Sequence, residues 1–295
     1  MKKNKLTKKR KKTESTSKKI IRLLMTVLII GVTLLMVIPF VWMISASFKT
    51  EADVMRIPID WIPNYLYLEN YRKVLSIGDK YKIDYHFPLA YWNSIKVSVS
   101  STVLSIASAA MAGYAFAKMK FKGSNVLFIL YLSQMMVPSQ LTLIPRFTIF
   151  TELGLTNTHW ALILPSVTTA SGAFLFRQAF LSVPDELREA ARIDGAGEYR
   201  TFLQVMLPLI KPTLAAQGTV QFLGNWNSYL DPLIFTPDWR KMTLPIALDQ
   251  FVGPDTTQYN LTMTACCLTI VPVLIVFLVG QKYFLKGMTV GAVKG

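Results

Sequence analysis

Long apolar runs separated by polar intervals dominate the sequence from Ile20 onward. A helix needs about 20 predominantly apolar residues to cross the roughly 30 Å hydrocarbon core of a bilayer. Several runs approach or exceed that length, so we expect them to cross a membrane as helices. The pattern predicts an all-α membrane protein with six transmembrane helices, which cover residues 20–46, 91–117, 125–143, 158–176, 212–235 and 261–279.

The polar intervals differ in charge, and this difference predicts the side of the membrane that each one faces. Most Lys and Arg residues lie before the first span, in the turn after the second, in the interval 177–211, or after the last span. Basic residues concentrate in the cytoplasmic segments of membrane proteins. Both termini are therefore expected in the cytoplasm.

The two ends divide the chain into three parts. Residues 1–19 are rich in Lys, Arg, Ser and Thr, so we expect a disordered basic tail held against anionic lipid. The apolar run behind it exceeds the roughly 7–15 residues of a signal-peptide core, so we interpret it as a retained span. Residues 20–280 then form the six-helix domain, and residues 281–295 form a cytoplasmic tail.

The composition agrees with a membrane protein. Hydrophobic residues make up 52% of the 295 residues, and the mean hydropathy is +0.37. A net charge of +15 can indicate nucleic-acid binding, but in so apolar a chain it indicates basic cytoplasmic segments, and we expect no nucleic-acid partner. The adjacent Cys266 and Cys267 lie in an apolar run, where we expect them to fill the core and to form neither a disulfide nor a metal site.

The second span has a composition that predicts its packing. Residues 91–117 are rich in Ser, Ala and Gly. Small side chains let helices approach closely within lipid. We therefore place this span at a helix–helix interface.

The interval 182–212 is polar, yet its sequence predicts local structure. Pro184 suits a first helical position, with Ser182 or Asp185 as the cap, and apolar residues then recur at roughly helical spacing. Gly195 follows them and can adopt a positive φ, so we expect it to end this helix.

A second short helix is expected over about residues 197–205. Two short helices joined by a glycine would form a rigid projection that is suited to docking into a partner protein. Glu189 lies in the first of them, where Arg188 or Arg192 could pair with it at the surface for little energy.

The same interval carries a spaced motif: Glu189-Ala190-Ala191, three residues, Gly195, nine residues, Val205, one residue, and Leu207-Pro208. The motif resembles the EAA loop of bacterial ABC-importer permeases, with Val205 in place of the family's Ile. In that family the loop docks into an ATPase subunit. The resemblance implies the six-helix fold of the ABC-importer permease (MetI-like) type, and ATPase-coupling residues Glu189, Ala190, Ala191, Asp194, Gly195 and Pro208.

Amide and aromatic side chains are concentrated near the end of span 212–235. Such groups are costly in a bilayer, so we expect them to face the bundle interior or a cavity. Amides can satisfy sugar hydroxyls and aromatic rings can stack on sugars, while hydrogen bonding between helices is an equal alternative. The stretch resembles the Trp-Asn-x-x-x-x-Pro-Leu segment of carbohydrate-uptake permeases. The candidate substrate-pathway residues are Asn225, Asn227 and Tyr229, together with Gln134 in span 125–143, for which core packing is the alternative.

A glycine-punctuated tail follows the last span. Its glycines make it a poor helix, so we expect an extended segment that can thread into a partner, with a disordered end as the alternative. The tail resembles the ending of maltose-type permeases, which reaches into the ATPase dimer. That resemblance adds Gly287, Gly291 and Lys294 to the coupling residues.

The sequence contains no recognisable catalytic or nucleotide-binding chemistry of its own. It has no GxxxxGK[ST] motif for ATP phosphates, no Ser/His/Asp set and no HExxH motif. Charged residues that could relay ions are nearly absent from the predicted spans, so the driving energy has to come from another subunit. We therefore expect no enzymatic activity, no cofactor and no metal in this chain.

The resemblance supplies the remaining expectations. It implies a permease subunit of a maltose-type carbohydrate importer, multi-pass in the bacterial plasma (inner) membrane, that carries a di- or oligosaccharide by alternating access. Its implied partners are a second homologous permease in a heterodimer, two ABC ATPase subunits that bind ATP and Mg, an extracytoplasmic solute-binding protein, the sugar and membrane lipid. The alternatives are an importer of polyamine, phosphate or iron, and a membrane enzyme or receptor subunit.

Overall fold

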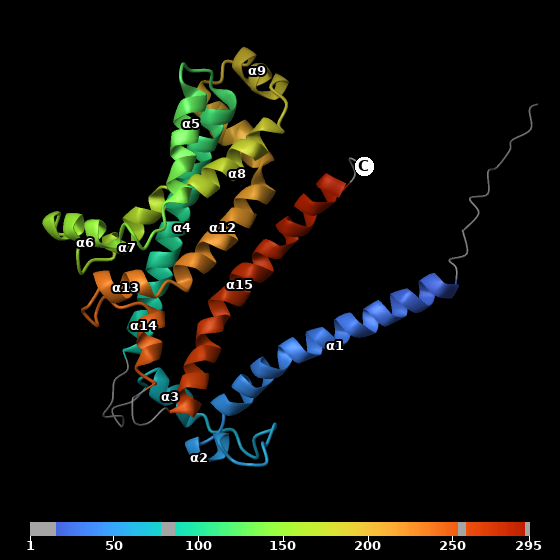
Figure 1. Cartoon of the computed structure of the whole chain (residues 1–295), viewed down its shortest axis with the longest axis vertical. Coiled ribbons are helices and arrows are strands. Elements are labelled where there is room, and N and C mark those ends of the chain that lie inside the picture. Colours follow the sequence, from blue (N-terminus) through green and yellow to red (C-terminus); the bar gives the residue numbers. More distant parts are fainter. Residues whose placement is uncertain (1–15, 78–85, 253–257, 293–295) are drawn as a thin grey trace, which may run out of the picture.

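A computed structural model describes residues 16–77, 86–252 and 258–292, with side chains in the last helix described up to Tyr283. Every regular element within these ranges is a helix (Figure 1). The expected all-α class is therefore confirmed for the described residues.

Three helices among the described residues are long and apolar enough to cross a membrane: α1 (Thr16–Ser47), α4 (Phe87–Lys118) and α15 (Tyr259–Ala292). They correspond to the first, second and last predicted spans. Because α1 begins at Thr16, the expectation of disorder is wrong for residues 16–19. A formed helix extends into adjoining residues at low cost, which accounts for this extra turn. Residues 1–15 of the predicted tail lie outside the described residues.

The other three predicted spans are interrupted. The third consists of α5 (Ser124–Ser133) and the 3₁₀ turn η1 (Gln134–Met136), and α6 (Leu143–Glu152) follows after a break. The fourth consists of α7 (Trp160–Ile163), the 3₁₀ turn η2 (Leu164–Val167) and α8 (Ala170–Leu181). The fifth consists of α12 (Lys211–Trp226) and α13 (Leu230–Phe235). Pro138 and Pro165 lie at two of these breaks, where they cannot donate a backbone hydrogen bond. The structure therefore does not confirm the count of six spans, which stays a prediction.

The small residues of α4 let other helices pack closely against it. α4 lies against α8 and α12 (Figure 1). A Cβ atom added at Gly113 would lie 2.8 Å from the Cβ of Phe176 and 2.9 Å from the backbone N of Arg177. The predicted helix–helix interface is thus confirmed, and the buried small residues of α4 include Ser94, Ser98, Ser101, Ser105, Ala109, Ala110 and Gly113.

Two buried clusters rich in aromatic residues fix α4 near its two ends. The cluster near its C-terminal end is formed by residues that include Tyr114, Phe176, Phe180, Phe202 and Met206. The cluster near its N-terminal end is formed by residues that include Phe87, Phe222, Trp226, Leu244 and Phe251. Buried aromatic side chains contribute most of the apolar area of such a core, so each cluster couples α4 to a different group of neighbours.

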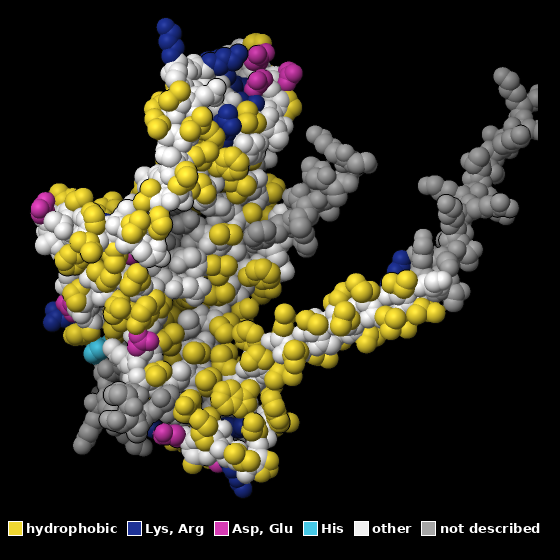
Figure 2. All heavy atoms as spheres, viewed as in Figure 1, with side chains coloured by type: hydrophobic (Ala, Val, Ile, Leu, Met, Phe, Trp, Pro, Cys, Tyr) yellow, Lys and Arg dark blue, Asp and Glu magenta, His cyan; other side chains and the backbone are white. Residues whose placement is uncertain are grey.

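Helix α1 has little contact with the rest of the chain except near its C-terminal end. Figure 2 shows it as a separate rod covered by apolar side chains. Its end is held by Asn70, whose Nδ2 donates to the carbonyl oxygens of Ser47 (2.9 Å) and Lys49 (2.7 Å), while Asn260 donates to the Asn70 Oδ1 (2.9 Å). The short helices α2 (Glu51–Val54), α3 (Glu69–Val74) and α14 (Leu244–Asp249) lie at this end of the molecule.

The predicted C-terminal tail continues α15. The helix runs to Ala292, so the expectation of an extended segment after residue 280 is wrong up to that residue. A glycine costs only about 1 kcal/mol relative to alanine inside a helix, and extending an existing helix needs no new nucleus. Gly287 and Gly291 therefore lie within a helix, whereas Lys294 lies outside the described residues.

Candidate functional site

Residues 182–212, called the α9 loop here, form a structured projection at one end of the molecule (Figure 1). The loop contains α9 (Glu186–Ile193), α10 (Glu198–Thr201), the π-helical turn η3 (Phe202–Met206) and α11 (Leu207–Leu209). Gly195 joins the first two helices with φ +80°, a left-handed conformation that favours glycine. The prediction of two short helices joined at this glycine is confirmed.

The predicted cap of α9 is wrong. Asp185 stands at the N-cap position with a helical backbone, and no side chain caps the helix there. Ser182 donates its hydroxyl to the carbonyl of Ala179 (2.7 Å). The Ser182 hydroxyl is thus bonded within the preceding turn, and the Asp185 carboxylate is bonded to Lys118 on α4.

Lys118 at the end of α4 makes the first connection between α4 and the α9 loop. Its side chain is buried, and its Nζ donates to the carbonyl oxygen of Val183 (2.7 Å) and to the Asp185 Oδ1 (2.5 Å). The hydrogen bond and charge of Lys118 hold the pKa of Asp185 below its usual value. The base of the α9 loop is therefore tied to α4.

Glu198 makes the second connection. Its carboxylate accepts hydrogen bonds from the Tyr114 hydroxyl on α4 and from the Arg188 Nε (3.0 Å), and its Oε2 lies 3.4 Å from the Arg192 Nη2. Partial burial acts to raise the pKa of Glu198, but the hydrogen bonds from Tyr114 and Arg188 outweigh it and hold that pKa below its usual value. Both arginines that the sequence offers to Glu189 are therefore bound to Glu198.

Glu189 itself points away from this network. Its side chain is exposed and forms no hydrogen bond or ion pair with any described residue. Ile193, one helical turn further on the same face, has an exposed fraction of 86%. The α9 loop thus presents a free carboxylate and an apolar side chain on a rigid support, and Figure 2 shows acidic side chains gathered at this end.

The remaining predicted residues of the loop have different environments. Ala190 and Asp194 are exposed, with Asp194 at the C-cap of α9, whereas Ala191 is buried. Pro208 lies in α11. The side of the α9 loop that packs against the rest of the chain is apolar, because Phe202 and Met206 belong to the buried cluster that contains Tyr114.

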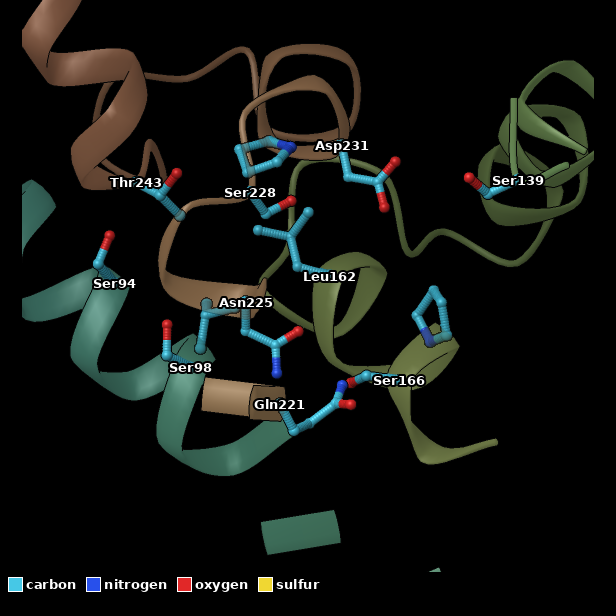
Figure 3. A pocket seen from close by; sticks show the side chains of 13 residues that line it. Ser94, Ser98, Ser139, Leu162, Ser166, Gln221, Asn225, Ser228, Asp231 and Thr243 are labelled. Atoms are coloured by element: carbon cyan, nitrogen blue, oxygen red, sulfur yellow. The ribbon is translucent and has the colours of Figure 1, made fainter. Parts of the chain in front are cut away.

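A second candidate site is a cavity of about 430 Å³ beside the N-terminal half of α4. Figure 3 shows side chains from several separate segments converging on it. Its lining is predominantly polar and consists of Ser94, Val97, Ser98, Ser139, Leu162, Pro165, Ser166, Gln221, Asn225, Ser228, Asp231, Pro232 and Thr243. We call this cavity the α4 pocket.

Several polar atoms of the α4 pocket have no partner in the protein. The Ser98 Oγ, the Asn225 Nδ2 and the Thr243 Oγ1 are buried and make no hydrogen bond. Ser94 differs, because its Oγ accepts from the backbone N–H of Leu244 (2.7 Å). These three atoms add unsatisfied hydrogen-bonding capacity to the wall of the α4 pocket, although buried atoms outside its lining, such as the Ser101 and Ser105 Oγ, are also unpaired.

One ionisable side chain lines the α4 pocket. Asp231 accepts a hydrogen bond from the Arg146 Nη2 on α6 (2.5 Å), and the Arg146 guanidinium also lies 4.9 Å from the centroid of the Phe235 ring. The carboxylate is therefore paired with a cation that stands behind it and does not line the pocket.

The structure brings only one of the four predicted pathway residues into the α4 pocket, namely Asn225. Asn227 is exposed and donates to the carbonyl of Leu223 on its own helix (3.0 Å). Tyr229 is exposed and donates to the Asp249 Oδ2 (2.6 Å). Gln134 is exposed on η1 and lies outside the lining.

Sequence reasoning missed most of the lining. Ser94 and Ser98 are four residues apart on α4, and Gln221 and Asn225 are four apart on α12. Residues with this spacing share a helix face, so pairs of polar residues at i and i+4 within an apolar span were the available signal. Thr243 gave no such signal, because only the tertiary fold brings it to the pocket.

Comparisons with known proteins show that this chain is similar to membrane components of transport systems. A family model described as "Binding-protein-dependent transport system inner membrane component" matches residues 101–290. The arabinooligosaccharides transport system permease protein AraQ of Halalkalibacterium halodurans is 37% identical, with 92% of this chain and 96% of that protein covered.

The names of two further similar proteins refer to acidic solutes. The sn-glycerol-3-phosphate transport system permease protein UgpE of Brucella abortus is 32% identical, with 89% of this chain and 93% of that protein covered. A crystal structure of a bacterial ABC transporter involved in the import of the acidic polysaccharide alginate contains a chain with a TM-score of 0.81 and 25% identity, covering 92% of this chain and 99% of that one.

Proposed function

Because this chain belongs to the family of binding-protein-dependent transport system inner membrane components, we propose that it is the transmembrane permease subunit of an ATP-driven importer for a di- or oligosaccharide. The family consists of transport components, so the chain is a permease subunit and not an enzyme, as its sequence predicts. It is an inner-membrane component of an ABC transporter.

The observation that carries the proposal is the state of Glu189. The α9 loop is fixed to α4 through Lys118 and Glu198, yet the Glu189 carboxylate remains exposed and unpaired among the described residues. The chain also has no phosphate-binding motif for ATP. A rigid loop with a free carboxylate is suited to receiving a cation of a separate ATPase subunit.

The α9 loop and the α4 pocket share one structural element. Lys118 and Tyr114 of α4 hold the loop, and Ser94 and Ser98 of the same helix line the pocket. Lys118 follows Ser94 by 24 helical positions, which corresponds to about 36 Å at 1.5 Å per residue. A displacement of the loop by the ATPase would therefore reach the pocket through a single continuous helix.

The partners follow from this role. Two ATPase subunits would bind ATP and Mg, a second homologous permease would complete the pathway, and an extracytoplasmic binding protein would deliver the sugar. Glu189, Ala190, Ala191, Asp194, Gly195 and Pro208 would form the ATPase contact. The C-terminal end of α15, with Gly287, Gly291 and Lys294, would add a second contact.

The proposed orientation places the α9 loop and both termini in the cytoplasm. The concentration of Lys and Arg in these segments supports it. A cysteine introduced at Glu152 on α6 should react with an impermeant thiol reagent in intact cells. A cysteine introduced at Gly197 should react only after permeabilisation, and the reverse pattern would contradict the orientation.

The function is tested by purification and transport together. The tagged chain, extracted in mild detergent, should retain a P-loop ATPase and a second permease. Vesicles reconstituted with this complex and its binding protein should take up a neutral oligosaccharide only when ATP is supplied. A complex that contains no ATPase, or that hydrolyses ATP without moving any sugar, would overturn the proposal.

A further inference from the structure

The α4 pocket contains buried hydrogen-bonding groups that the chain itself does not satisfy. Ser98 and Thr243 have exposed fractions of 1% and 4%, and neither side-chain oxygen has a partner. The Asn225 Nδ2, on the facing helix α12, is also unpaired (Figure 3). Water or a solute in the cavity is one source of partners for these groups, since buried polar groups are rarely left unpaired.

The charge of the lining excludes one class of partner. Asp231 is the one acidic residue of the lining, which contains no Lys, Arg or His. Its Oδ1 holds the Arg146 Nη2 at 2.5 Å, and the Arg146 side chain has an exposed fraction of 18%. An anion in the pocket would therefore meet a carboxylate and find no free cation among the lining residues.

We infer that the α4 pocket is a transit site for neutral, hydroxyl-rich solutes, and that Asp231, held by Arg146, excludes anionic sugars from it. The inference rests on the proposed function, because it assigns a substrate class to that importer. It separates this chain from relatives named for the transport of sn-glycerol 3-phosphate and alginate, which are anionic.

The hydrogen-bonding chemistry favours hydroxyl groups. The Asn225 Nδ2 can only donate, whereas the Ser98 and Thr243 hydroxyls can donate or accept. A sugar hydroxyl does both, so it can pair with either kind of group. A carboxylate or a fully ionised phosphate can only accept, and close to Asp231 it would place two like charges near each other.

The lining also explains why such a site would release its solute. It contains no aromatic side chain, since Trp226 is buried against Tyr91 and Phe222 with ring centroids 5.7 Å apart in each pair. The expectation that aromatic rings in this stretch stack on sugar is therefore not met by the pocket lining. Binding through hydroxyl contacts alone would be weak, as a site on a transport pathway requires.

Direct binding of two probes tests the inference. The purified permease–ATPase complex, in lipid nanodiscs and without binding protein, is mixed with arabinotriose or with trigalacturonate, and saturation-transfer NMR measures binding. Arabinotriose should bind to the wild type, and trigalacturonate should neither bind nor compete. Equal binding of the two probes would overturn the inference.

Two asparagines provide a matched pair of variants. Asn225→Ala removes an unpaired donor from the α4 pocket, whereas Asn227→Ala removes an exposed amide that is bound to its own helix. Asn225→Ala should weaken arabinotriose binding about 3- to 10-fold, the effect of losing one neutral hydrogen bond. Asn227→Ala should leave binding unchanged, and equal effects of both variants would contradict the assignment.

Removing the carboxylate tests the exclusion of anions. Asp231→Asn leaves the Arg146 charge uncompensated at the pocket, so trigalacturonate should begin to bind. Where this variant fails to assemble, Ser228→Lys keeps the ion pair, adds a cation to the lining and should have the same effect. If neither variant gains trigalacturonate binding, charge does not select the solute in this pocket.

The proposed function and this inference fail in different ways. Absence of ATP-driven uptake by the complete wild-type importer removes the proposed function and the transit role with it. Normal uptake combined with unchanged arabinotriose binding in Asn225→Ala removes only the inference.

Discussion

The polar groups near the two ends of α4 differ in whether they have partners within the chain. At the C-terminal end, charged side chains are paired within the chain: Lys118 with Asp185, and Glu198 with Tyr114 and Arg188. In the α4 pocket the one charged side chain, Asp231, is also paired, but three neutral groups are buried without partners. The paired groups hold a fixed shape, whereas the unpaired groups can bind another molecule without first breaking a contact.

Glu189 is an exception to the pairing of charged side chains near the C-terminal end of α4. It lies among paired charges, yet it is exposed and unpaired within the described part of the chain. The α9 loop therefore combines a paired scaffold with a single free carboxylate. We interpret the unpaired polar groups at both ends of α4 as the places where other molecules bind.

The largest expected effect follows from removing that carboxylate. Glu189→Ala should weaken association with the ATPase by about 2–5 kcal/mol, since truncating one partner of a desolvated charge pair leaves the other charge buried alone. Retention of the ATPase during purification and sugar-stimulated ATP hydrolysis in vesicles would measure the loss. Glu152→Ala on α6 changes net charge equally but leaves the loop intact, so it should behave as wild type. If both variants couple normally, the ATPase contact lies elsewhere.

The next effect tests the close contact between α4 and α8. Gly113→Ala would force α4 and α8 apart, because the new Cβ would meet the backbone N of Arg177 at 2.9 Å, and overpacking of this kind typically costs about 1–3 kcal/mol. Thermal unfolding in detergent and coupled ATP hydrolysis should both suffer. Gly218→Ala in α12 has no atom within 4 Å of the added Cβ and should not lower stability. Equal stability of the two variants would show that the close contact is not needed.

A smaller effect separates the orientation of the α9 loop from its charge. Gly195→Val places a β-branched residue at φ +80°, which costs about 1–2 kcal/mol. Gly197 has φ −65° and equally open surroundings at the N-cap of α10, so Gly197→Thr, which has the shape of Val and suits an N-cap, should be nearly neutral. Coupled ATP hydrolysis should fall only in the first variant, and no charge change in the ATPase should restore it. A comparable loss in the second variant would mean that bulk, and not backbone conformation, disturbs the loop.

The smallest effect concerns pH. The pKa values of Asp185 and Glu198 are both lowered in the folded protein. Their stabilisation is therefore fully present above the unfolded values near 3.8 and 4.5, and is lost as pH falls through the lower folded values. A spin label at Tyr199→Cys should keep constant mobility from about pH 8 to pH 5. Increasing mobility within that range would show that these ion pairs do not fix the loop.

The sequence predicted the α9 loop better than the α4 pocket, for physical reasons. The loop is a local structure, so the helix signals on either side of Gly195 and the spacing from Glu189 to Pro208 lie within one stretch. Its anchors could not be predicted, because Lys118 and Tyr114 come from a distant span. The apolar pattern also did not predict the interruptions in the spans, because Pro138 and Pro165 break the helices within runs that are continuously apolar in composition.

The pocket combines residues that are far apart in sequence. Asn225 was predicted from the polar residues of α12, but Asn227 and Tyr229, from the same stretch, face elsewhere. A periodicity of 3.6 residues separates these faces only if the helix is continuous, and α12 ends at Trp226. Asn227, two residues after Asn225, would face away from it even on a continuous helix, whereas Tyr229, four residues after Asn225, is turned away by the helix break.

The central claim is that Glu189, unpaired within its own chain, is the group that meets the ATPase. Its most direct test is thiol labelling of Glu189→Cys in inside-out vesicles, in a background in which Cys266 and Cys267 are replaced by serine. Lys122→Cys, exposed in the turn between α4 and α5, serves as the reference. With the ATPase stripped away, both positions should react. With the ATPase restored, position 189 should be protected while position 122 remains reactive. Equal labelling of position 189 with and without the ATPase would contradict the account.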